Sequence, residues 1–364
     1  MKTICLVSCY HDTSYVRATS LLAALQSLPN VKVIVVKNRH RGLLRYPEVI
    51  WKLWRTRRQP IDAYLLAFRG QEILPLLLLL AGKKPVIFDE YIIPLAYAQE
   101  NHARSLKTAF LHQFVRLIQP SYRHWLKRCR LILADTEAHA SLSAQLNKLP
   151  LSKYLAVPVG TDEALFYPKA TAPSKEFQVF YYSTGMQPLH GVPTVLEAAV
   201  ILKDRPDISF LIVGGKQRLH KAVIEAQSGG ANITYRSWIP FEQLADYMRQ
   251  SGLCLGGPFG GTTQAQNVVT TKTYQMLATA VPALIGDSPV SRNYFKDRQN
   301  VLMVPQANPQ ALADRILWAS KHRKLLHQLA IDGRKLYESK LSVEAIAQRL
   351  EPAIGQLLTS DVDN

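Results

Sequence analysis

Three glycine-rich stretches in the second half of the chain have the composition of phosphate-binding turns. They are the segments 183–191 (STGMQPLHG), 213–217 (VGGKQ) and 256–267 (GGPFGGTTQAQN). Each follows an apolar run typical of a strand and precedes a helical pattern, so backbone N–H groups and the positive end of the helix dipole can face an anion. A single turn of this kind is common in ordinary structure. Three of them in one part of the chain predict a diphosphate site.

Several side chains in and after these turns are candidates for contacts with the phosphates. Gly185 and Gly214 let the backbone approach a ligand, and Lys216 is a cation within the second turn. The stretch 267–286 (NVVTTKTYQMLATAVPALIG) predicts a loop, a helix capped by Thr271 and a buried strand. Lys272 lies in the first turn of that helix and is expected to face the same ligand.

Strand and helix patterns alternate along the first half of the chain. The runs 3–9 (TICLVSC) and 31–38 (VKVIVVKN) predict strands, and 13–28 carries Leu and Ala at helical spacing. The run 71–82 (QEILPLLLLLAG) is much shorter than the roughly twenty apolar residues that a membrane span needs. We therefore expect a buried helix there, followed by a strand at 84–90 (KPVIFDE).

The same alternation restarts after a segment rich in Pro, Ala and Lys at 167–176 (YPKATAPSKE). Strands are predicted at 177–184 (FQVFYYST) and 208–215 (ISFLIVGG), with a helix between them. This pattern indicates an α/β fold with two doubly wound parallel sheets, and the segment near residue 170 is the expected linker. Ligands of such sheets bind beyond the carboxyl ends of the strands, so the site is expected in the cleft between the two domains.

The charge of the chain favours an anionic partner. Lys and Arg number 44 against 27 Asp and Glu, a formal net charge of +17. The segments 39–58 and 104–130 combine bases with apolar residues and Trp at helical spacing, a pattern suited to the surface of an anionic membrane. Taken singly, each segment is slightly better explained as an ordinary core face with a solvated basic exterior. Their presence in one half of the chain favours the membrane, and no nucleic-acid-binding motif is recognisable.

The cysteines and the amino terminus argue against a metal centre and against secretion. Cys5, Cys9, Cys129 and Cys254 are scattered, and no His or Cys pair completes a zinc pattern. No metal site is therefore expected. The first residues lack a signal-peptide cleavage region. We expect a cytoplasmic protein, peripheral on the inner leaflet of the cell membrane.

Residues 181–340 resemble the nucleotide-sugar-binding domain of a GT-B glycosyltransferase, most closely of family GT4. The matching pieces are, in order, GMQPLHGVPTVLEAA, ISFLIVGG, NITYRSWIPFEQLADYM, LCLGGPFGGTTQAQNVVTTKTYQMLATAVPALIGDSP and VLMVPQANPQALADRI. In the first half, 156–168 (AVPVGTDEALFYP) resembles the link out of the family's N-terminal domain, and 84–90 its acceptor-side strand. The resemblance covers nearly the whole chain.

The resemblance implies two Rossmann-like domains that face each other across a cleft. An acceptor-binding domain would span residues 1–170, and a nucleotide-sugar-binding domain would span 171–340. A helix at 341–358 would pack back on the first domain.

The family's donor site can be transferred residue by residue. By resemblance, Ser237, Trp238 and Ile239 lie beside the nucleotide base. The residues that would face the diphosphate and sugar are Gly260, Gly261 and Thr262. Gln275 takes the place of the family's ribose-binding Glu, and Asn267 the place of its paired carboxylate. The whole set expected to bind the donor is Gly185, His190, Gly214, Lys216, Trp238, Ile239, Gly260, Gly261, Thr262, Asn267, Thr271 and Gln275.

The sequence departs from the family pattern at the charged positions. Met186 and His190 stand nearest to the Arg and Lys that usually neutralise the diphosphate, and Lys272, Lys216 or Arg292 would have to supply that charge. Two carboxylates follow the acceptor-side strand where the family has a His. We expect Asp89, Glu90 and Lys272 to be the catalytic residues.

These features predict a Leloir glycosyltransferase that moves a sugar from a UDP- or GDP-sugar to a lipid-linked or polysaccharide acceptor. In retaining enzymes of the family the donor phosphate accepts the proton, so neither a protein base nor a metal or other cofactor is required. The alternative is a GT-B-like protein without turnover that serves as a binding or scaffolding partner of an active transferase, which Gln275 and Asn267 favour. The retained glycine turns and Lys272 favour the enzyme. A dehydrogenase is disfavoured because no Gly-x-Gly-x-x-Gly follows the first strand.

Overall fold

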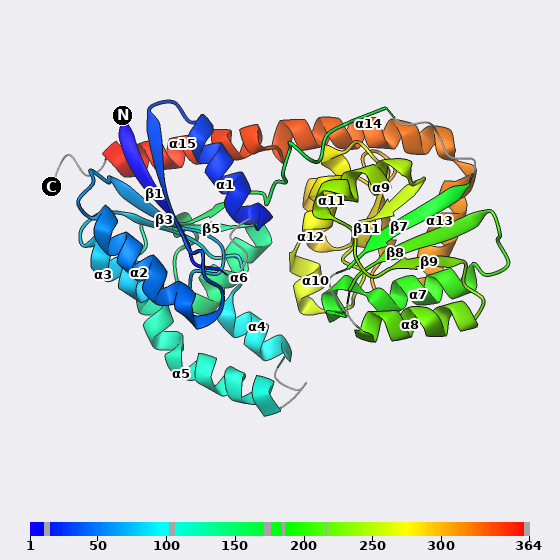
Figure 1. The fold of residues 1–364 in the computed structure, drawn as a ribbon, viewed down its shortest axis with the longest axis horizontal. Coiled ribbons are helices and arrows are strands. Elements are labelled where there is room, and N and C mark those ends of the chain that lie inside the picture. Colours follow the sequence, from blue (N-terminus) through cyan, green and yellow to red (C-terminus); the bar gives the residue numbers. More distant parts are fainter. Residues whose placement is uncertain (11–14, 102–105, 171–175, 184–185, 216, 360–364) are drawn as a thin grey trace. The chain divides into compact units, whose positions relative to one another are not determined.

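The chain forms two compact units, which we describe separately (Figure 1). The computed structural model describes residues 1–10, 15–101, 106–170, 176–183, 186–215 and 217–359. The first unit comprises Met1–Gly160 together with the chain from Val343 on, and the second comprises Thr161–Ser342.

The predicted domain boundary at residue 170 is too late, because the segment that follows Gly160 already belongs to the second unit. The Arg249 guanidinium donates to the backbone oxygen of Tyr167 (2.6 Å). The hydroxyl of Tyr337 donates to Glu163 Oε1 (2.8 Å). Polar and charged side chains of the second unit thus hold the segment that the sequence reading assigned to the first domain.

The first unit is built on a sheet of six parallel strands in the order β2-β1-β3-β4-β5-β6. The strands are β1 (Lys2–Ser8), β2 (Val31–Lys37), β3 (Ala63–Leu66), β4 (Val86–Asp89), β5 (Leu131–Ala134) and β6 (Tyr154–Ala156). Every residue of β3 and β4 is buried, as expected for central strands covered on both faces. The edge strand β2 is only half-buried.

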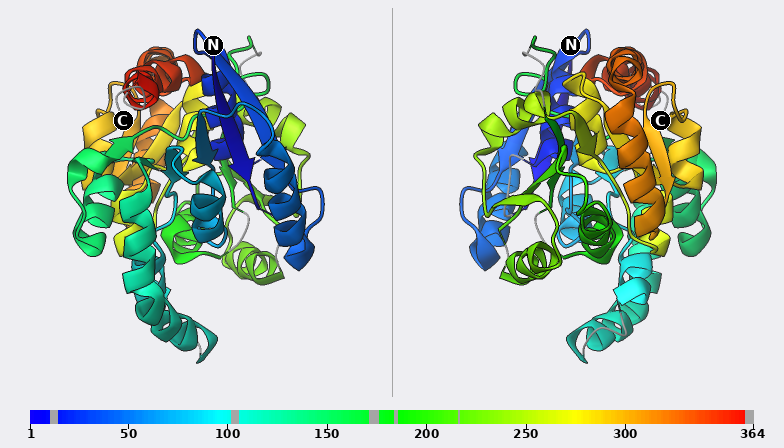
Figure 2. Two further views of the ribbon diagram at one scale, coloured as in Figure 1. Left: turned by 90° about the vertical axis from the view of Figure 1, so that its left-hand side faces the viewer. Right: turned by 90° about the vertical axis from the view of Figure 1, so that its right-hand side faces the viewer.

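Helices cover both faces of this sheet. They are α1 (Val16–Ser27), α2 (Arg45–Thr56), α3 (Leu74–Ala81), α4 (Pro94–Asn101), α5 (Leu106–Arg128), α6 (Glu137–Asn147) and α15 (Val343–Thr359). The buried apolar residues of α1 and α15 share one core cluster, whereas those of α2, α3, α5 and α6 share another on the opposite face. The carboxyl-terminal helix α15 packs directly against α1. The amino-terminal part of α5 extends beyond the sheet with α4 beside it (Figures 1 and 2).

The second unit has six parallel strands in the order β12-β11-β10-β7-β8-β9. The strands are β7 (Phe177–Tyr182), β8 (Ile208–Val213), β9 (Ile233–Arg236), β10 (Leu253–Leu255), β11 (Ala283–Asp287) and β12 (Leu302–Pro305). The helices are α7 (Val192–Ile201), α8 (Gln217–Ser228), α9 (Leu244–Gln250), α10 (Thr263–Asn267), α11 (Thr271–Ala278), α12 (Pro289–Tyr294), α13 (Pro309–Lys321) and α14 (Arg323–Lys340). The chain starts at β7 and winds outward in one direction, then restarts beside it at β10. The switch point of this doubly wound sheet therefore lies between β7 and β10.

Two expectations about membranes and thiols can be compared with the fold. Among the described helices, none is both long enough and apolar enough to cross a bilayer. The apolar run at 71–82 contains the short helix α3, which ends at Ala81 and is followed by Gly82 (φ 62°). All four cysteines are free and buried.

Candidate functional site

The carboxyl ends of β7 and β10 and the start of α11 come together at the switch point of the second unit. The β7 strand ends at Tyr182, and Gly256 follows β10. The hydroxyl of Thr270 donates to the backbone oxygen of Gly256 (2.6 Å), which ties the start of α11 to the end of β10. Thr270, and not the predicted Thr271, occupies the N-cap position, and its side chain makes this contact instead of capping the helix. Thr271 is the first residue of α11.

Lys272 is the dominant charge of this site. Its side chain is only 4% exposed. The ammonium donates to the backbone oxygen of Tyr182 (3.2 Å) and lies 4.4 Å from the centre of the Tyr181 ring. No described carboxylate pairs with it, and burial lowers its pKa to about 7. A buried cation held by aromatic faces and one carbonyl is suited to an anionic ligand, which would supply the missing counter-charge.

Gln275 lies one turn further along α11 and is almost completely buried. Its side-chain oxygen accepts a hydrogen bond from the hydroxyl of Tyr182. This contact fixes the amide beside the end of β7. A neutral amide in this position can exchange hydrogen bonds with sugar hydroxyls, but without the charge-assisted strength of a carboxylate.

Two of the glycine-rich turns pack directly on one another. A Cβ atom on Gly260 would lie 1.8 Å from the backbone oxygen of Pro188, and one on Gly191 would lie 2.3 Å from the carbonyl carbon of Phe259. Gly191 also has φ 62°, a conformation that favours glycine. The turn 256–262 and the turn before α7 therefore form one compact backbone surface, and side chains at these two glycines would separate them.

His190 does not replace the missing cation of the first turn. Its pKa is lowered to about 3, first because the ring is buried and second because Lys272 is near. The imidazole is therefore neutral at physiological pH. Its Nδ1 atom is buried and has no hydrogen-bond partner in the described part of the chain. A neutral ring with an unpaired nitrogen can exchange a hydrogen bond with a ligand but cannot neutralise a phosphate.

The other predicted donor residues occupy varied environments. Thr262 caps α10 by accepting from the Ala265 backbone N–H (3.1 Å), and Asn267 donates to the backbone oxygen of Thr263 (2.8 Å). Trp238 is 73% exposed, whereas Ile239 is buried. Gly261 is exposed, and Gly214 packs so closely on Ser183 that a Cβ would lie 2.2 Å from its backbone oxygen. Two predicted residues, Gly185 and Lys216, lie outside the described residues.

Arg292, a third candidate for the missing charge, is already paired. Its guanidinium makes two hydrogen bonds of 2.7 Å to the carboxylate of Asp287. Of the two cations that lie in the described residues, Lys272 is thus the one that no described carboxylate pairs with.

The predicted catalytic carboxylates lie inside the first unit and are engaged there. Asp89 Oδ1 accepts from the fully buried Arg17 guanidinium (2.8 and 3.0 Å), and Oδ2 accepts from the Phe68 backbone N–H (3.2 Å). Glu90 accepts from the hydroxyls of Tyr122 (2.6 Å) and Ser143, and burial raises its pKa. In this arrangement neither carboxylate is exposed to an acceptor. Their geometry offers no support for the predicted catalytic role.

Three residues of these sites were not identified from the sequence. Tyr182 is the last residue of a strand, a position that faces ligands in parallel sheets, and that position was the available signal. Thr270 precedes a predicted helix and was one residue from the expected cap. Arg17 gave no signal, because an Arg within an amphipathic helix ordinarily points to solvent.

In the described residues, no three His, Cys, Asp or Glu side chains come close enough to hold a metal ion. The switch point presents the buried ammonium of Lys272, the side-chain amide of Gln275, the neutral imidazole of His190 and the backbone of the glycine turns. Such a set can bind a diphosphate and the hydroxyls attached to it.

Comparison with known families and structures agrees with this geometry. Residues 165–336, which lie within the second unit, match the family described as glycosyl transferases group 1. No curated protein sequence matches the chain.

Among solved structures, the chain is similar to HepE from Anabaena in complex with UDP-glucose (13% identity, TM-score 0.69, covering 98% of this chain and 100% of HepE). It is also similar to sucrose-phosphate synthase from Thermosynechococcus elongatus (16% identity, TM-score 0.72, covering 99% and 100%). A third similar structure is a glycosyltransferase from Rickettsia africae (12% identity, TM-score 0.70, covering 98% of each chain).

Proposed function

We propose, on the premise that residues 165–336 belong to the group 1 glycosyltransferases and that the whole chain has the GT-B fold, that this protein transfers a sugar from a nucleoside diphosphate sugar. The observation that carries the proposal is Lys272, a buried cation without a described carboxylate partner at the switch point. The donor diphosphate would be its counter-ion. A UDP- or GDP-sugar is the proposed donor, and the complex of HepE with UDP-glucose supports the former.

The residues of the switch point would stabilise the departing diphosphate. In the reaction, the bond between the anomeric carbon and the diphosphate oxygen breaks and a bond to the acceptor hydroxyl forms. Negative charge grows on the diphosphate, where Lys272 and the backbone N–H groups of the glycine turns would stabilise it. Gln275 and Tyr182 would hydrogen-bond the ribose. We propose retention of configuration, with the acceptor proton passing to the donor phosphate.

A nucleotide screen tests the donor site. The melting temperature of the purified protein would be measured with UDP, GDP, ADP, dTDP and CMP, with and without magnesium. Stabilisation by one nucleotide identifies the base, because a ligand that binds only the folded state raises the melting temperature. If none stabilises the protein while an active GT-B enzyme responds under the same conditions, the proposed donor site is rejected and a binding or scaffolding role is favoured.

We further propose that helix α2 brings the protein to an anionic membrane surface, where the acceptor is lipid-linked or part of a polysaccharide. Trp51 and Trp54 are about half-exposed on this helix. The guanidinium of Arg55 lies 4.7 Å from the Trp51 ring centre, and those of Arg57 and Arg58 lie 5.6 and 5.9 Å from the Trp54 ring centre. Exposed indole rings with guanidinium groups beside them are well suited to the headgroup region of an anionic bilayer.

Helix α5 adds exposed apolar surface on the same face of the first sheet as α2. Phe110 and Leu117 are 74% and 77% exposed, and Phe114 is about half-exposed. They recur at helical spacing, so they form one outward stripe. A bilayer of anionic lipids is the occupant that the net charge of +17 favours for these apolar surfaces.

Vesicle binding tests the membrane proposal. Replacement of Arg55, Arg57 and Arg58 by Gln should reduce binding to phosphatidylserine-containing vesicles by about a factor of ten or more, since each base near the surface contributes about 1 kcal/mol. A matched control replaces Lys203, Arg218 and Lys221 of the second unit by Gln and should bind as the parent does. Undiminished binding of the α2 variant in a sedimentation assay would reject the proposed membrane face.

A further inference from the structure

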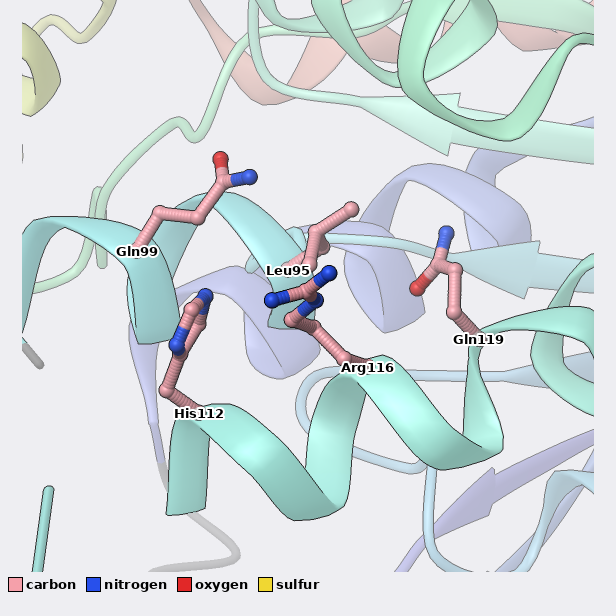
Figure 3. Close-up of a pocket in the computed structure, with 5 residues that line it drawn as sticks. All are labelled: Leu95, Gln99, His112, Arg116 and Gln119. Atoms are coloured by element: carbon pink, nitrogen blue, oxygen red, sulfur yellow. The ribbon is translucent and has the colours of Figure 1, made fainter. Parts of the chain in front are cut away.

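An open pocket of about 440 Å³ lies between helices α4 and α5 of the first unit (Figure 3). Its lining residues are Leu95, Gln99, His112, Arg116 and Gln119. Because α4 follows β4 directly, the pocket lies toward the carboxyl ends of the first sheet, where open parallel sheets bind their ligands. The pocket residues of α5 occupy the helix face opposite the apolar stripe of Phe110, Phe114 and Leu117. Pocket and stripe are therefore separate surfaces of one helix.

Gln119 presents an unpaired acceptor to this pocket. The side chain is only 9% exposed, and its Nε2 donates to Asn147 Oδ1 (2.8 Å). Its Oε1 atom is buried and has no hydrogen-bond partner among the described residues. In Figure 3 this oxygen lies on the side of the pocket that holds Arg116. A buried acceptor without a partner costs about 1–3 kcal/mol, so an O–H donor of a ligand would relieve a real penalty.

A buried hydrogen-bond chain holds this amide in place. Asn147 donates to the backbone oxygen of Ser143 (3.0 Å), and the Ser143 hydroxyl donates to Glu90. Tyr122 donates to the other oxygen of Glu90 (2.6 Å). Glu90, which the sequence suggested as a catalytic residue, is thus connected through two side chains to the floor of the pocket.

Arg116 supplies a positive charge to the same pocket. It is exposed and forms no ion pair or hydrogen bond within the described part of the chain. Its planar guanidinium can bind a phosphate or carboxylate through two parallel hydrogen bonds. Leu95 adds an apolar wall on the α4 side, against which the C–H groups of a sugar ring can pack. Cation, hydroxyl acceptor and apolar wall thus surround one volume of saccharide size.

We propose that the α4–α5 pocket binds a saccharide that carries an anionic group, with the anion on Arg116 and a sugar hydroxyl on Gln119 Oε1. This inference rests on the proposed function, since it makes the pocket a subsite for an acidic sugar of the acceptor. The anion is a phosphate or a carboxylate. Both give the same contact with a guanidinium.

Titration of the full chain with small acidic sugars tests the pocket. Glucose 6-phosphate and glucuronate would each be titrated by saturation-transfer NMR, beside glucose and inorganic phosphate. We expect at least one acidic sugar to bind about ten times more tightly than glucose and than inorganic phosphate, because a charge-assisted hydrogen bond and a hydroxyl contact act together. The better of the two acidic sugars identifies the anion.

Two variants assign the binding to the proposed residues. Arg116→Gln should weaken binding of the acidic sugar about tenfold or more, whereas Lys83→Gln, which removes another exposed charge of the first unit, should not. Gln119→Met should weaken glucose and the acidic sugar alike, with its melting temperature recorded as a check on folding. Equal affinity of Arg116→Gln and the parent, or equal affinity for inorganic phosphate and both acidic sugars, would overturn the inference. If a nucleotide still raises the melting temperature of the same samples, the proposed donor site stands even though the pocket proposal has failed.

Discussion

Two buried cations, one in each unit, lie near the carboxyl ends of parallel strands and have opposite surroundings. Arg17 has no exposed surface, and its guanidinium makes four hydrogen bonds. Asp89 accepts two of them at 2.8 and 3.0 Å, and two backbone oxygens accept from Nη1 at 2.6 and 2.7 Å. Lys272 is almost as deeply buried, yet it has one backbone oxygen and the faces of two tyrosines. The first charge has been neutralised by the fold, and the second has not.

This difference separates a charge that maintains structure from one that is available to a ligand. Burial on its own opposes the charge on both side chains. The carboxylate of Asp89 outweighs burial and raises the pKa of Arg17, whereas nothing outweighs burial at Lys272, whose pKa falls to about 7. Substitutions at the two positions should therefore affect different properties of the protein.

The largest expected effect is on stability at Arg17. Arg17→Met leaves Asp89 buried without its cation and should lower the free energy of unfolding by about 3–5 kcal/mol. Lys272→Met removes one hydrogen bond, but it also removes the cost of burying a charge. Its free energy of unfolding should therefore stay within about 1 kcal/mol of the parent value. Urea denaturation followed by circular dichroism measures both.

A double variant controls for the loss of packing at Arg17. Arg17→Met combined with Asp89→Leu removes both charges and should recover much of the lost stability. Equal destabilisation by Arg17→Met and Lys272→Met would contradict the distinction between the two cations.

The next effect is on ligand binding at Lys272. Lys272→Met should weaken the nucleoside diphosphate found in the thermal screen by about tenfold or more, since a charge-assisted hydrogen bond contributes about 1.5–3 kcal/mol. Arg292→Met, which removes a cation already paired with Asp287, serves as the matched control and should bind normally. Isothermal titration calorimetry gives both dissociation constants. A value unchanged by Lys272→Met would remove Lys272 from the site.

The pH dependence of nucleotide-sugar binding tests whether the charge of Lys272 is available to the ligand. Lys272 is charged below its pKa of about 7 and becomes neutral above it, whereas a bound diphosphate favours the charged form. Affinity for the nucleotide sugar should therefore be flat below about pH 7 and fall by up to tenfold per pH unit above it, with proton uptake on binding. A nucleotide sugar is the suitable probe because its diphosphate does not titrate in this range. Titrations between pH 6 and 8.5 should show this fall in the parent and not in Lys272→Met.

The smallest effect is expected from giving Lys272 a carboxylate neighbour. Gln275→Glu places the charge that the family has at this position, three residues along α11 from Lys272. A carboxylate should strengthen the contact with ribose hydroxyls and improve nucleoside binding about two- to fivefold at pH 7. It should also raise the pKa of Lys272 and so shift the pH profile of binding upward. Gln266→Glu, on α10, is the control. Weaker binding by Gln275→Glu would mean that the neutral amide is itself required.

The alternation of strands and helices could be predicted from the sequence because both sheets are parallel and have helices on both faces. Runs such as 31–38 and 208–215 are rich in Val and Ile, and the helices between them carry apolar residues at helical spacing. The glycine turns of the second unit were also predictable, because close backbone approach leaves a compositional signature at positions such as Gly260. Lys272 was selected because it lies in the first turn of the helix that follows the third glycine-rich turn.

The sequence did not allow pairing between distant side chains to be predicted. Asp89 and Glu90 are acidic residues at a strand end, which is where catalytic carboxylates occur, and nothing nearby in sequence shows that Arg17 and Tyr122 occupy them. The partners are separated from them by long stretches of chain. The same limitation concealed Gln119, whose importance depends on an oxygen that no neighbour contacts.

The return of the chain to the first unit has a consequence for how the protein is made. Helix α15 contributes Ile346, Leu350 and Ile354 to the core that α1 and the first sheet share. These residues leave the ribosome after the whole of the second unit, since synthesis proceeds from the amino terminus. The first domain to be synthesised is therefore the last to be completed. Until α15 arrives, the apolar side of α1 is without its cover, and a premature stop after Ser342 would leave it so permanently.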